Sequence, residues 1–326
     1  MTAPSDELAV GIVIPARDAA GTLGLLLDDL AAQHPDRARV VVVDDGSTDT
    51  TADLVAQRAT GASWLSLVRG PGRGPAAARN AGAAAVEGPW LAFIDADVRL
   101  DEDWLQAGLR VTAEADADVV EGMVVPRGGD DRGLVLHTAS SQGDEVFVTA
   151  NLWVRRTAFE AVGGFDESYR VPWREDTDLG WRLQAAGARR AAAPGVTVFH
   201  PHARRRVRTL FREGARLDAD TRLRARFPDR FALLLPRRGF RTTYAAFFLL
   251  LALAASVATS APVGVVAVTA CVAEVASLLA VRNAVHERRR PFWWEWAALA
   301  AVAPALVVCR VFWVARANVA HRQSFW

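Results

Sequence analysis

The sequence contains no lysine, so each of its 38 basic side chains is an arginine. With the abundant alanine, this indicates the codon usage of a GC-rich genome and carries no information about function. Cysteine is scarce: Cys271 and Cys309 lie in apolar runs and fit neither a metal-ligand spacing nor a disulfide framework, which favours a reducing compartment. The polar, acidic stretch Met1–Leu8 lacks the basic and apolar parts of a signal peptide, so none is predicted.

The composition places the chain among globular proteins. With 51% apolar and 23% charged residues, it is neither disordered nor collagen-like, and its 326 residues suffice for one large domain or two ordinary ones. The net charge of +1 is unevenly distributed, because Ala203–Arg241 carries 13 arginines and only four acids. Such asymmetry indicates an anionic partner. Since a long apolar tract follows, we expect that partner to be a membrane surface and not nucleic acid.

Three apolar segments make up the C-terminal tract. About 20 apolar residues span a bilayer core, so the first two segments, separated at Pro262, predict a transmembrane hairpin. Arginines beyond both outer ends place those ends in the cytoplasm. The third segment contains Glu295 and Arg310, which leaves open whether it spans the membrane or lies at the interface. The segments are Tyr244–Ser260, Val263–Val281 and Phe292–Val314.

Strand-like and helix-like segments alternate before this tract. Val40–Val43 is a continuous β-branched run, which is typical of a strand buried on both faces. The alternation predicts an α/β fold with a mostly parallel sheet flanked by helices. The predicted strands are Leu8–Pro15, Val40–Val43, Trp64–Val68, Trp90–Ile94 and Val119–Val125, and the predicted helices are Thr22–Gln33, Thr48–Arg58, Ala76–Ala85 and Asp101–Glu114.

A pair of carboxylates, Asp44 and Asp45, follows the Val40–Val43 strand, where open α/β sheets bind ligands. A structural interpretation has Ser47 or Thr48 capping the next helix, with Asp49 in its first turn. Capping does not account for Asp44 and Asp45, because adjacent like charges repel unless a ligand or cation compensates them.

Asp95 and Asp97 end the Trp90–Ile94 strand, and a period of two places them on the same side. Two carboxylates facing one way suit a divalent cation, Mg²⁺ or Mn²⁺, with open positions for phosphate oxygens. A D-x-D pair alone is a weak signal. Its weight rises because it shares a sheet edge with Asp44 and Asp45.

A glycine-rich loop opens the helix within Arg73–Gly82 and predicts an anion site, to which Arg79 would add a charge-assisted contact. The pattern Gly72–Ala77 also fits a loose dinucleotide-binding fingerprint, which would indicate an NAD-dependent oxidoreductase. Against that alternative, the loop follows the third strand and contains Pro75. A purely structural interpretation is a helix start whose small residues permit close packing.

Three acids, Glu175, Asp176 and Asp178, open a helical pattern within Trp173–Leu183. Acids in a first helical turn complement the helix dipole, which accounts for one or two of them. Three exceed what capping needs. A carboxylate at a helix N-terminus stays ionised at neutral pH, which suits a general base.

In their order and spacing these motifs resemble the inverting family 2 glycosyltransferases, which have a GT-A fold. The resemblance covers roughly Ala9–His202 and implies a nucleotide-diphosphate sugar donor and a divalent metal, Mg²⁺ or Mn²⁺. The motifs that carry it are Asp44–Asp49, Ala78–Gly82, Asp95–Asp97, Thr149–Leu152, Gly163–Glu167 and Glu175–Leu179.

The resemblance also implies roles for individual residues. Asp176 would be the catalytic base, Glu175 would help to place the acceptor, and Asp97 would hold the metal, with Asp95 beside the ribose or the metal. His200 and His202 are candidate contacts, although a histidine at a strand end is more often structural. The implied donor-binding residues are Pro15, Arg17, Asp44, Asp45, Arg79, Asp95 and Asn151.

The family resemblance leaves alternatives open. The Q-x-x-R-W element of processive synthases is absent after His202, so transfer of a single sugar is favoured. A polyprenyl-phosphate sugar synthase is the nearest alternative, and a non-catalytic sugar-nucleotide-binding membrane protein is another. We therefore expect a membrane-anchored glycosyltransferase in the inner membrane, with its catalytic domain in the cytoplasm. The expected acceptor is lipid-linked or a cell-envelope glycan. The predicted parts are residues 1–202 (catalytic), 203–241 (basic, juxtamembrane) and 242–326 (membrane).

Overall fold

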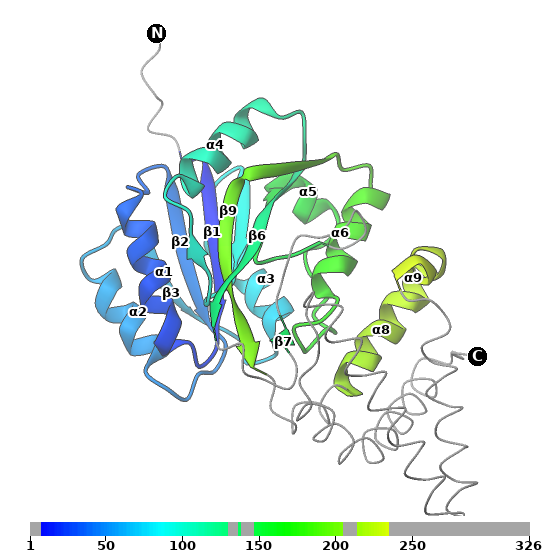
Figure 1. Ribbon diagram of the computed structural model, residues 1–326, viewed down its shortest axis with the longest axis horizontal. Helices are drawn as coiled ribbons and strands as arrows, with labels where there is room; N and C mark the ends of the chain where they lie inside the picture. Colours follow the sequence, from blue (N-terminus) through cyan, green and yellow to red (C-terminus); the bar gives the residue numbers. More distant parts are fainter. Residues whose placement is uncertain (1–7, 130–135, 138–146, 205–213, 235–326) are drawn as a thin grey trace, which may run out of the picture. The chain divides into compact units, whose positions relative to one another are not determined.

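The computed structural model describes residues 8–129, 136–137, 147–204 and 214–234 (Figure 1). The chain divides into two compact units: Met1–Gly128 with Thr138–Pro201, and Gly129–His137 with His202–Trp326. The predicted membrane segments lie outside the described residues. Among the residues that are described, no helix has the length and apolar character needed to cross a membrane.

A mixed β-sheet with helices on both faces forms the first unit (Figure 1). Strands β3, β2, β1 and β4 are parallel neighbours in that order, as the alternation of strands and helices predicts. Beyond β4 the prediction of a mostly parallel sheet is wrong, because β8 pairs antiparallel with both β4 and β6, and β5 pairs antiparallel with β9. The strands are β1 (Val10–Ala16), β2 (Ala38–Asp44), β3 (Leu65–Arg69), β4 (Trp90–Ile94), β5 (Arg99–Leu100), β6 (Val119–Gly129), β7 (Leu136–His137), β8 (Asn151–Arg155) and β9 (Arg190–Arg204).

Both faces of the parallel strands are buried. Ile14 and Val42 share one hydrophobic cluster with leucines of α1 such as Leu27. On the other face α3 lies so close that a Cβ atom added to Gly82 would be 2.4 Å from Cγ1 of Val13. This double burial explains the continuous β-branched run of β2. The helices of this unit are α1 (Ala20–Ala32), α2 (Thr51–Ala59), α3 (Pro75–Ala85), α4 (Trp104–Glu114), α5 (Arg156–Ala161) and α6 (Glu175–Ala185).

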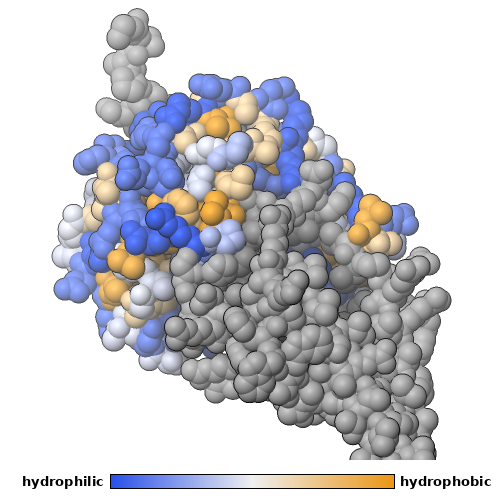
Figure 2. Space-filling view, viewed as in Figure 1, coloured by the Kyte–Doolittle hydropathy of each residue, from blue (hydrophilic) through white to orange (hydrophobic). Residues whose placement is uncertain are grey.

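The described surface of this unit is mainly hydrophilic in the view of Figure 2, where apolar residues appear as small separate areas. Leu25 on α1 is a large apolar side chain that is 50% exposed. Isolated exposed leucines are normal on soluble domains and need no ligand to explain them.

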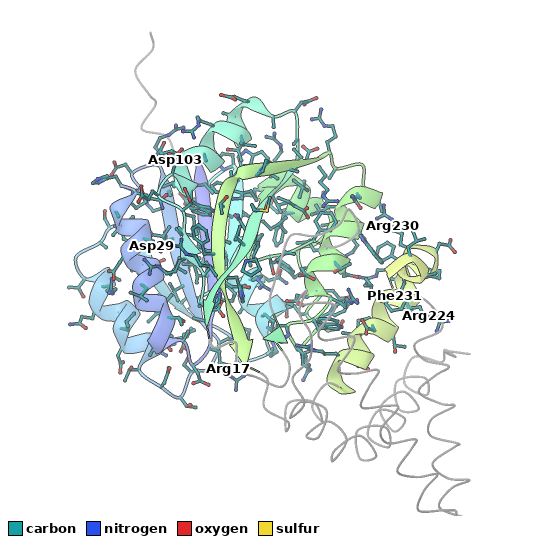
Figure 3. All side chains as sticks on the ribbon, viewed as in Figure 1. Arg17, Asp29, Asp103, Arg224, Arg230 and Phe231 are labelled. Carbon is teal, nitrogen blue, oxygen red and sulfur yellow. The ribbon has the colours of Figure 1, made fainter. Side chains whose placement is uncertain are left out.

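In the second unit the described residues form two helices, α8 (Gly214–Arg226) and α9 (Pro228–Leu234), which pack on each other. Leu223 and Phe231 are buried, while Arg224 and Arg226 occupy the last turn of α8, where cations complement the helix dipole. Figure 3 labels Arg224, Arg230 and Phe231 on these helices. The strand β7 also belongs to this unit and pairs with the end of β9.

Candidate active site

Polar residues gather where the parallel strands end. Strands β1 and β2 run in register with Ala16 beside Asp44, and Asp95 follows the last residue of β4. Arg17 lies at this end of the sheet, whereas Asp103 lies at the opposite end (Figure 3). The carboxyl edge of parallel strands is where open α/β sheets bind ligands.

Asp44 is buried, and its carboxylate is compensated by the protein itself. Its Oδ2 accepts a hydrogen bond from Nη1 of Arg69 at 2.6 Å, and its Oδ1 accepts one from the backbone N–H of Ser47 at 3.1 Å. Burial alone would raise the pKa of Asp44, but the bonds from Ser47 and Arg69 outweigh it and hold the pKa below its ordinary value. The protein itself therefore compensates this charge, and the donor-binding role of Asp44 stays a prediction.

Asp45 is also buried, and it organises the glycine-rich loop. Its two carboxylate oxygens accept the backbone N–H groups of Gly72 and Gly74, each at 2.8 Å. Gly74 has φ +102°, and a Cβ atom there would lie 2.5 Å from the carbonyl oxygen of Arg170, so only glycine fits. The N–H groups expected to cradle a phosphate are taken by this carboxylate. The dinucleotide-binding interpretation of the loop therefore loses its physical basis.

The loop after β1 is tied to the loop after β2. Oδ2 of Asp49 accepts the N–H of Ala20, the first residue of α1, at 3.1 Å, and its Oδ1 accepts the N–H of Thr51, the first residue of α2, at 3.0 Å. Ser47 Oγ accepts the N–H of Asp18 at 2.9 Å. The predicted cap is thus wrong in detail: α2 begins at Thr51, and the side chains before it hold the neighbouring loop.

Two of the predicted donor-binding residues stand at the end of β1. Pro15 is half-buried and Arg17 is exposed (Figure 3). The next residue, Asp18, adopts φ +50° and accepts the N–H of Thr48 at 2.7 Å, which fixes the backbone just beyond them. The structure therefore places Pro15 near the end of β1 and Arg17 directly after that strand, at the carboxyl edge of the sheet.

Arg79 of α3 is buried, 3% exposed, between two carboxylates. Its Nη2 donates to Oδ1 of Asp95 at 2.9 Å, and its Nη1 donates to Oε1 of Glu175 at 3.0 Å. Its guanidinium carbon lies 5.5 Å from the centre of the Phe165 ring. Arg79 thus joins the D-x-D motif to the acids of α6, residues that are 80 positions apart in sequence.

The acid pair begins α6. Arg174, just before the helix, has φ +72°, and Oδ1 of Asp176 accepts the N–H of Thr177 at 2.6 Å. Burial, followed by the negative charge of Asp176, raises the pKa of Glu175 to about 7, and burial also raises the pKa of Asp176. The expectation that a carboxylate at this helix N-terminus stays ionised at neutral pH is therefore wrong for Glu175, whose raised pKa instead suits the acceptance of a proton during catalysis.

Asp178, the third acid of this turn, forms an ion pair within α6. Its side chain is fully buried and Oδ2 accepts Nε of Arg182 at 2.7 Å, one helical turn away. Arg182 in turn donates to the carbonyl of Val162 at 2.7 Å. This arrangement holds α6 against the preceding turn, which gives Asp178 a structural part.

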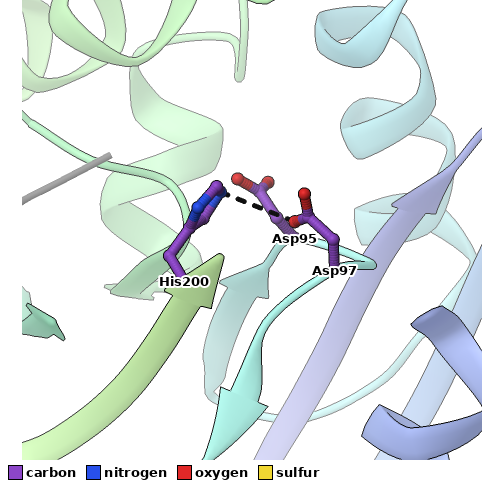
Figure 4. Close-up of side chains that lie close together, drawn as sticks. All are labelled: Asp95, Asp97 and His200. Atoms are coloured by element: carbon purple, nitrogen blue, oxygen red, sulfur yellow. Dashed lines mark ion pairs between the residues drawn. The ribbon is translucent and has the colours of Figure 1, made fainter. Parts of the chain in front are cut away.

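Asp95, Asp97 and His200 form a candidate cation site (Figure 4). One ligand atom from each lies within 4.8 Å of the others, and Nε2 of His200 is 3.5 Å from Oδ1 of Asp97. Burial raises the pKa of Asp97, and nearby Asp95 adds to the effect. Two oxygen donors and one imidazole nitrogen, in a place where negative charge is unfavourable, fit a divalent cation. His200 reaches this group from β9, whereas the side chain of His202 lies outside the described residues.

Asn151 occupies a different position from the one its family role implies. It is 1% exposed; its Oδ1 accepts Nε1 of Trp104 at 3.0 Å, and its Nδ2 donates to the carbonyls of Val196 at 2.8 Å and Met123 at 3.1 Å. These contacts tie β8 to β9, to β6 and to α4. Its side chain therefore supports the sheet beneath the site and presents no open face to a donor.

Replacing Asn151 with alanine should lower the free energy of unfolding by about 3 kcal/mol, because the variant leaves the buried indole N–H of Trp104 and two carbonyls short of a partner. Urea denaturation measures the change. Thr112→Ala is the matched control: that hydroxyl bonds carbonyls of its own helix, so its loss should cost less than about 1 kcal/mol. Equal losses would contradict the bridging part assigned to Asn151.

Glu175 should make stability depend on pH. A carboxyl whose pKa is about 7 in the folded chain and near 4.5 when unfolded binds its proton more tightly when folded. The free energy of unfolding should therefore fall as pH rises from about 4.5 to about 7. In Glu175→Gln, which cannot ionise, this decline should be smaller. Urea denaturation midpoints of the parent chain and of Glu175→Gln, measured across that pH range, give the comparison. If the midpoints of both proteins fell equally with pH, the prediction would be refuted.

One contributor to the site was missed by the sequence argument. Asn80, beside Arg79, receives the N–H of Phe165 on its Oδ1 at 2.9 Å and donates to the carbonyl of Phe165 at 2.9 Å. It also donates to Oε1 of Glu167 at 3.1 Å. Asn80 thus holds the Gly163–Glu167 turn on α3. The turn motif and the polar residue on α3 were visible in the sequence, but not their contact.

Residues 11–169 match the family Glycosyl transferase family 2. The chain is 30% identical over 244 residues to the pre-mycofactocin glycosyltransferase of Mycobacterium tuberculosis, covering 69% of this chain and 50% of that protein. It is 30% identical over 194 residues to glycosyltransferase AglE of Haloferax volcanii, covering 54% and 64% respectively. The chain therefore spans only half to two thirds of these relatives.

Among solved structures, the chain resembles the mannosyltransferase PcManGT from Pyrobaculum calidifontis, solved in complex with GDP-Man and Mn²⁺. The TM-score is 0.58 and the identity 22%, with 95% of this chain and 89% of that one covered. This likeness shows the fold alone: a GT-A-like α/β architecture with a mixed sheet.

Proposed function

We propose, on the premise that residues 11–169 form a family 2 glycosyltransferase domain, that this chain transfers one sugar from a nucleotide-diphosphate sugar to an acceptor hydroxyl with inversion. The observation that carries the proposal is the chain of contacts from Asp95 through Arg79 to Glu175. It joins a candidate cation site to a pair of carboxylates with raised pKa values. The groups proposed to activate the donor are thus linked through Arg79 to the carboxylates proposed to remove the proton.

In the proposed reaction, the acceptor oxygen forms a bond to the anomeric carbon while the bond from that carbon to the donor phosphate oxygen breaks. The hydroxyl proton passes to the carboxylate of Asp176, and Glu175 beside it orients the acceptor. Pro15 and Arg17 line the rim for the nucleotide. Asp44 and Asp45 act as supports of the surrounding loops, because their carboxylates already accept protein donors.

Asp95, Asp97 and His200 would hold the divalent cation. A bound cation neutralises charge on the leaving diphosphate. The imidazole nitrogen among the donors favours Mn²⁺ over Mg²⁺, which prefers oxygen ligands. The structurally similar mannosyltransferase PcManGT was solved in complex with Mn²⁺, which supports the proposal of Mn²⁺ here.

A screen of the purified full-length chain against UDP-, GDP- and dTDP-sugars with Mn²⁺ tests the proposal. Release of nucleoside diphosphate with one donor, abolished by chelator and restored by Mn²⁺, is the expected result. No release with any donor, including in the presence of candidate glycan and lipid-linked acceptors, would count against a catalytic function and leave a binding protein.

The acceptor and the location are also part of the proposal. Thirteen arginines within Ala203–Arg241 precede the apolar segments, and each arginine near an anionic leaflet contributes about 1 kcal/mol of attraction. The catalytic unit would then work at the cytoplasmic face of the inner membrane on an acceptor at that interface, lipid-linked or a cell-envelope glycan.

Cysteine labelling in intact cells tests this topology. In a chain whose Cys271 and Cys309 are replaced by serine, Ser260→Cys should react with an impermeant reagent, and Ser141→Cys should react only after lysis. Labelling of Ser141→Cys from outside, or release of the whole chain by a carbonate wash, would refute the arrangement.

A further inference from the structure

Arg79 is held by two carboxylates of the protein. Its two terminal nitrogens bond to Asp95 and Glu175, and the Phe165 ring lies 5.5 Å from its guanidinium carbon. With 3% of its surface exposed, it presents little to a ligand in solution. A buried guanidinium between two carboxylates differs from the phosphate-binding arginine that the loop motif implies.

Glu175 depends on this contact. Its Oε1 is fixed by Arg79, whereas its Oε2 is buried and has no hydrogen-bond partner in the described part of the chain. The bond to Arg79 therefore sets the direction in which Oε2 points. Removing one partner of a buried ion pair leaves an uncompensated charge, so Glu175 would move or take up a proton without Arg79.

The place of Arg79 is itself fixed by its surroundings. The side chain of the next residue, Asn80, accepts the backbone N–H of Phe165 and donates to its carbonyl. These two bonds hold the Phe165 ring beside the guanidinium. Gly82, one turn further along α3, allows the helix to lie against Val13 of β1. Arg79 thus stands on a helix anchored at several points.

We propose that Arg79 is a positioning residue for the transfer reaction: it acts through Glu175, which it fixes relative to Asp95, and does not bind the nucleotide. The inference rests on the proposed function. The planar fork of arginine can donate to both carboxylates at once, whereas the single ammonium of lysine cannot reproduce both bonds.

A double-mutant cycle tests it, with Arg79→Met, Glu175→Gln and the double variant of the full chain. Arg79→Met should lower kcat by about 10²-fold, the scale of a misplaced catalytic group. The double variant should be no slower than the slower single variant, because residues acting as a unit are not additive. Dissociation constants for UDP or GDP, measured without a divalent cation because Arg79 also contacts Asp95 of the candidate cation site, should stay within about threefold of the parent. The proposal would be overturned if the fold-losses in kcat of the two single variants multiplied in the double variant, or if Arg79→Met weakened nucleotide binding tenfold.

Two further variants separate positioning from folding. Arg79→Lys keeps the charge and should recover part of kcat. Arg156→Met removes another inward guanidinium, which donates to the carbonyls of Ala83, Val86 and Gly88, and should lower stability while leaving kcat unchanged. A loss of kcat in Arg156→Met equal to that in Arg79→Met would show that only folding is affected.

A readout without turnover keeps the inference separate from the proposed function. In the chain with ¹³C-labelled glutamate, the carboxyl signal missing from Glu175→Gln belongs to Glu175 and should titrate near pH 7. In Arg79→Lys or Arg79→Met its midpoint should move. If no donor is turned over, the proposed function fails, but the titration still tests whether Arg79 positions Glu175. A Glu175 midpoint that does not move in the Arg79 variants would refute the positioning role.

Discussion

Asp176→Asn should lower turnover by about 10²–10⁴-fold while nucleoside diphosphate binding stays nearly unchanged. The asparagine side chain has the same size, and its oxygen still accepts the N–H of Thr177, which is 2.6 Å from Oδ1 in the parent. It cannot accept the proton of the acceptor hydroxyl, and the expected loss is the usual scale for removing a general base. Steady-state kinetics with the donor identified by the screen, alongside calorimetry with UDP or GDP and Mn²⁺, measure both quantities.

Asp178→Asn is the matched control for this experiment. Asp178 lies on the same turn of α6 and is fully buried, but its partner is Arg182, at 2.7 Å. Its replacement should reduce stability and leave turnover close to that of the parent. If Asp176→Asn keeps parental turnover, Glu175 becomes the base; if Asp178→Asn loses turnover as Asp176→Asn does, the separation of the two acids is wrong.

Asp97→Ala should weaken Mn²⁺-dependent binding of a nucleoside diphosphate by at least about 10²-fold, since even indirect support of a metal site is worth 10–100-fold. The fold should be unaffected. Burial and Asp95 raise the pKa of Asp97, so its charge is unfavourable in the folded chain, and removing it takes away a repulsion. Calorimetry with and without chelator, together with thermal denaturation, gives the two results.

Asp103→Ala is the control for the cation site. Asp103 pairs with Arg110 on the surface at the opposite end of the sheet from Arg17 (Figure 3), and its loss should change neither quantity. Nucleotide binding that survives in Asp97→Ala would contradict the site. Tight NADH binding that ignores chelator would instead revive the dinucleotide alternative through Gly72 and Gly74.

The parallel half of the fold could be predicted because its signals are local. The β-branched run of β2 and the apolar run of β4 each predict a buried strand without any information from the rest of the chain. The antiparallel half gave weaker signals. Near its start, strand β9 contains alanines and Pro194, which are poor strand formers. Strand β8 begins with Asn151, a polar residue whose burial is tolerated only because its side chain is hydrogen-bonded.

The same limit applies to the site. Asp95 and Asp97 do lie close together, as expected. The period of a strand is not the reason, because β4 ends at Ile94 and the two residues lie in the turn that follows it. No local rule brings Arg79 to Glu175, 96 positions away, or His200 to Asp97, because these contacts depend on how α6 and β9 pack against the strand ends. Likewise the unpaired charges expected at Asp44 and Asp45 find partners in Arg69 and in the glycine loop.

The single carboxylate of Asp49 serves the first amides of two helices, at Ala20 and Thr51. A substitution at this position would therefore loosen both loops together, and neither loop can be remodelled in evolution without disturbing the other. Under the proposed function, a change of donor preference made through these loops would require paired changes on both of them, or a change at Arg17, which is exposed.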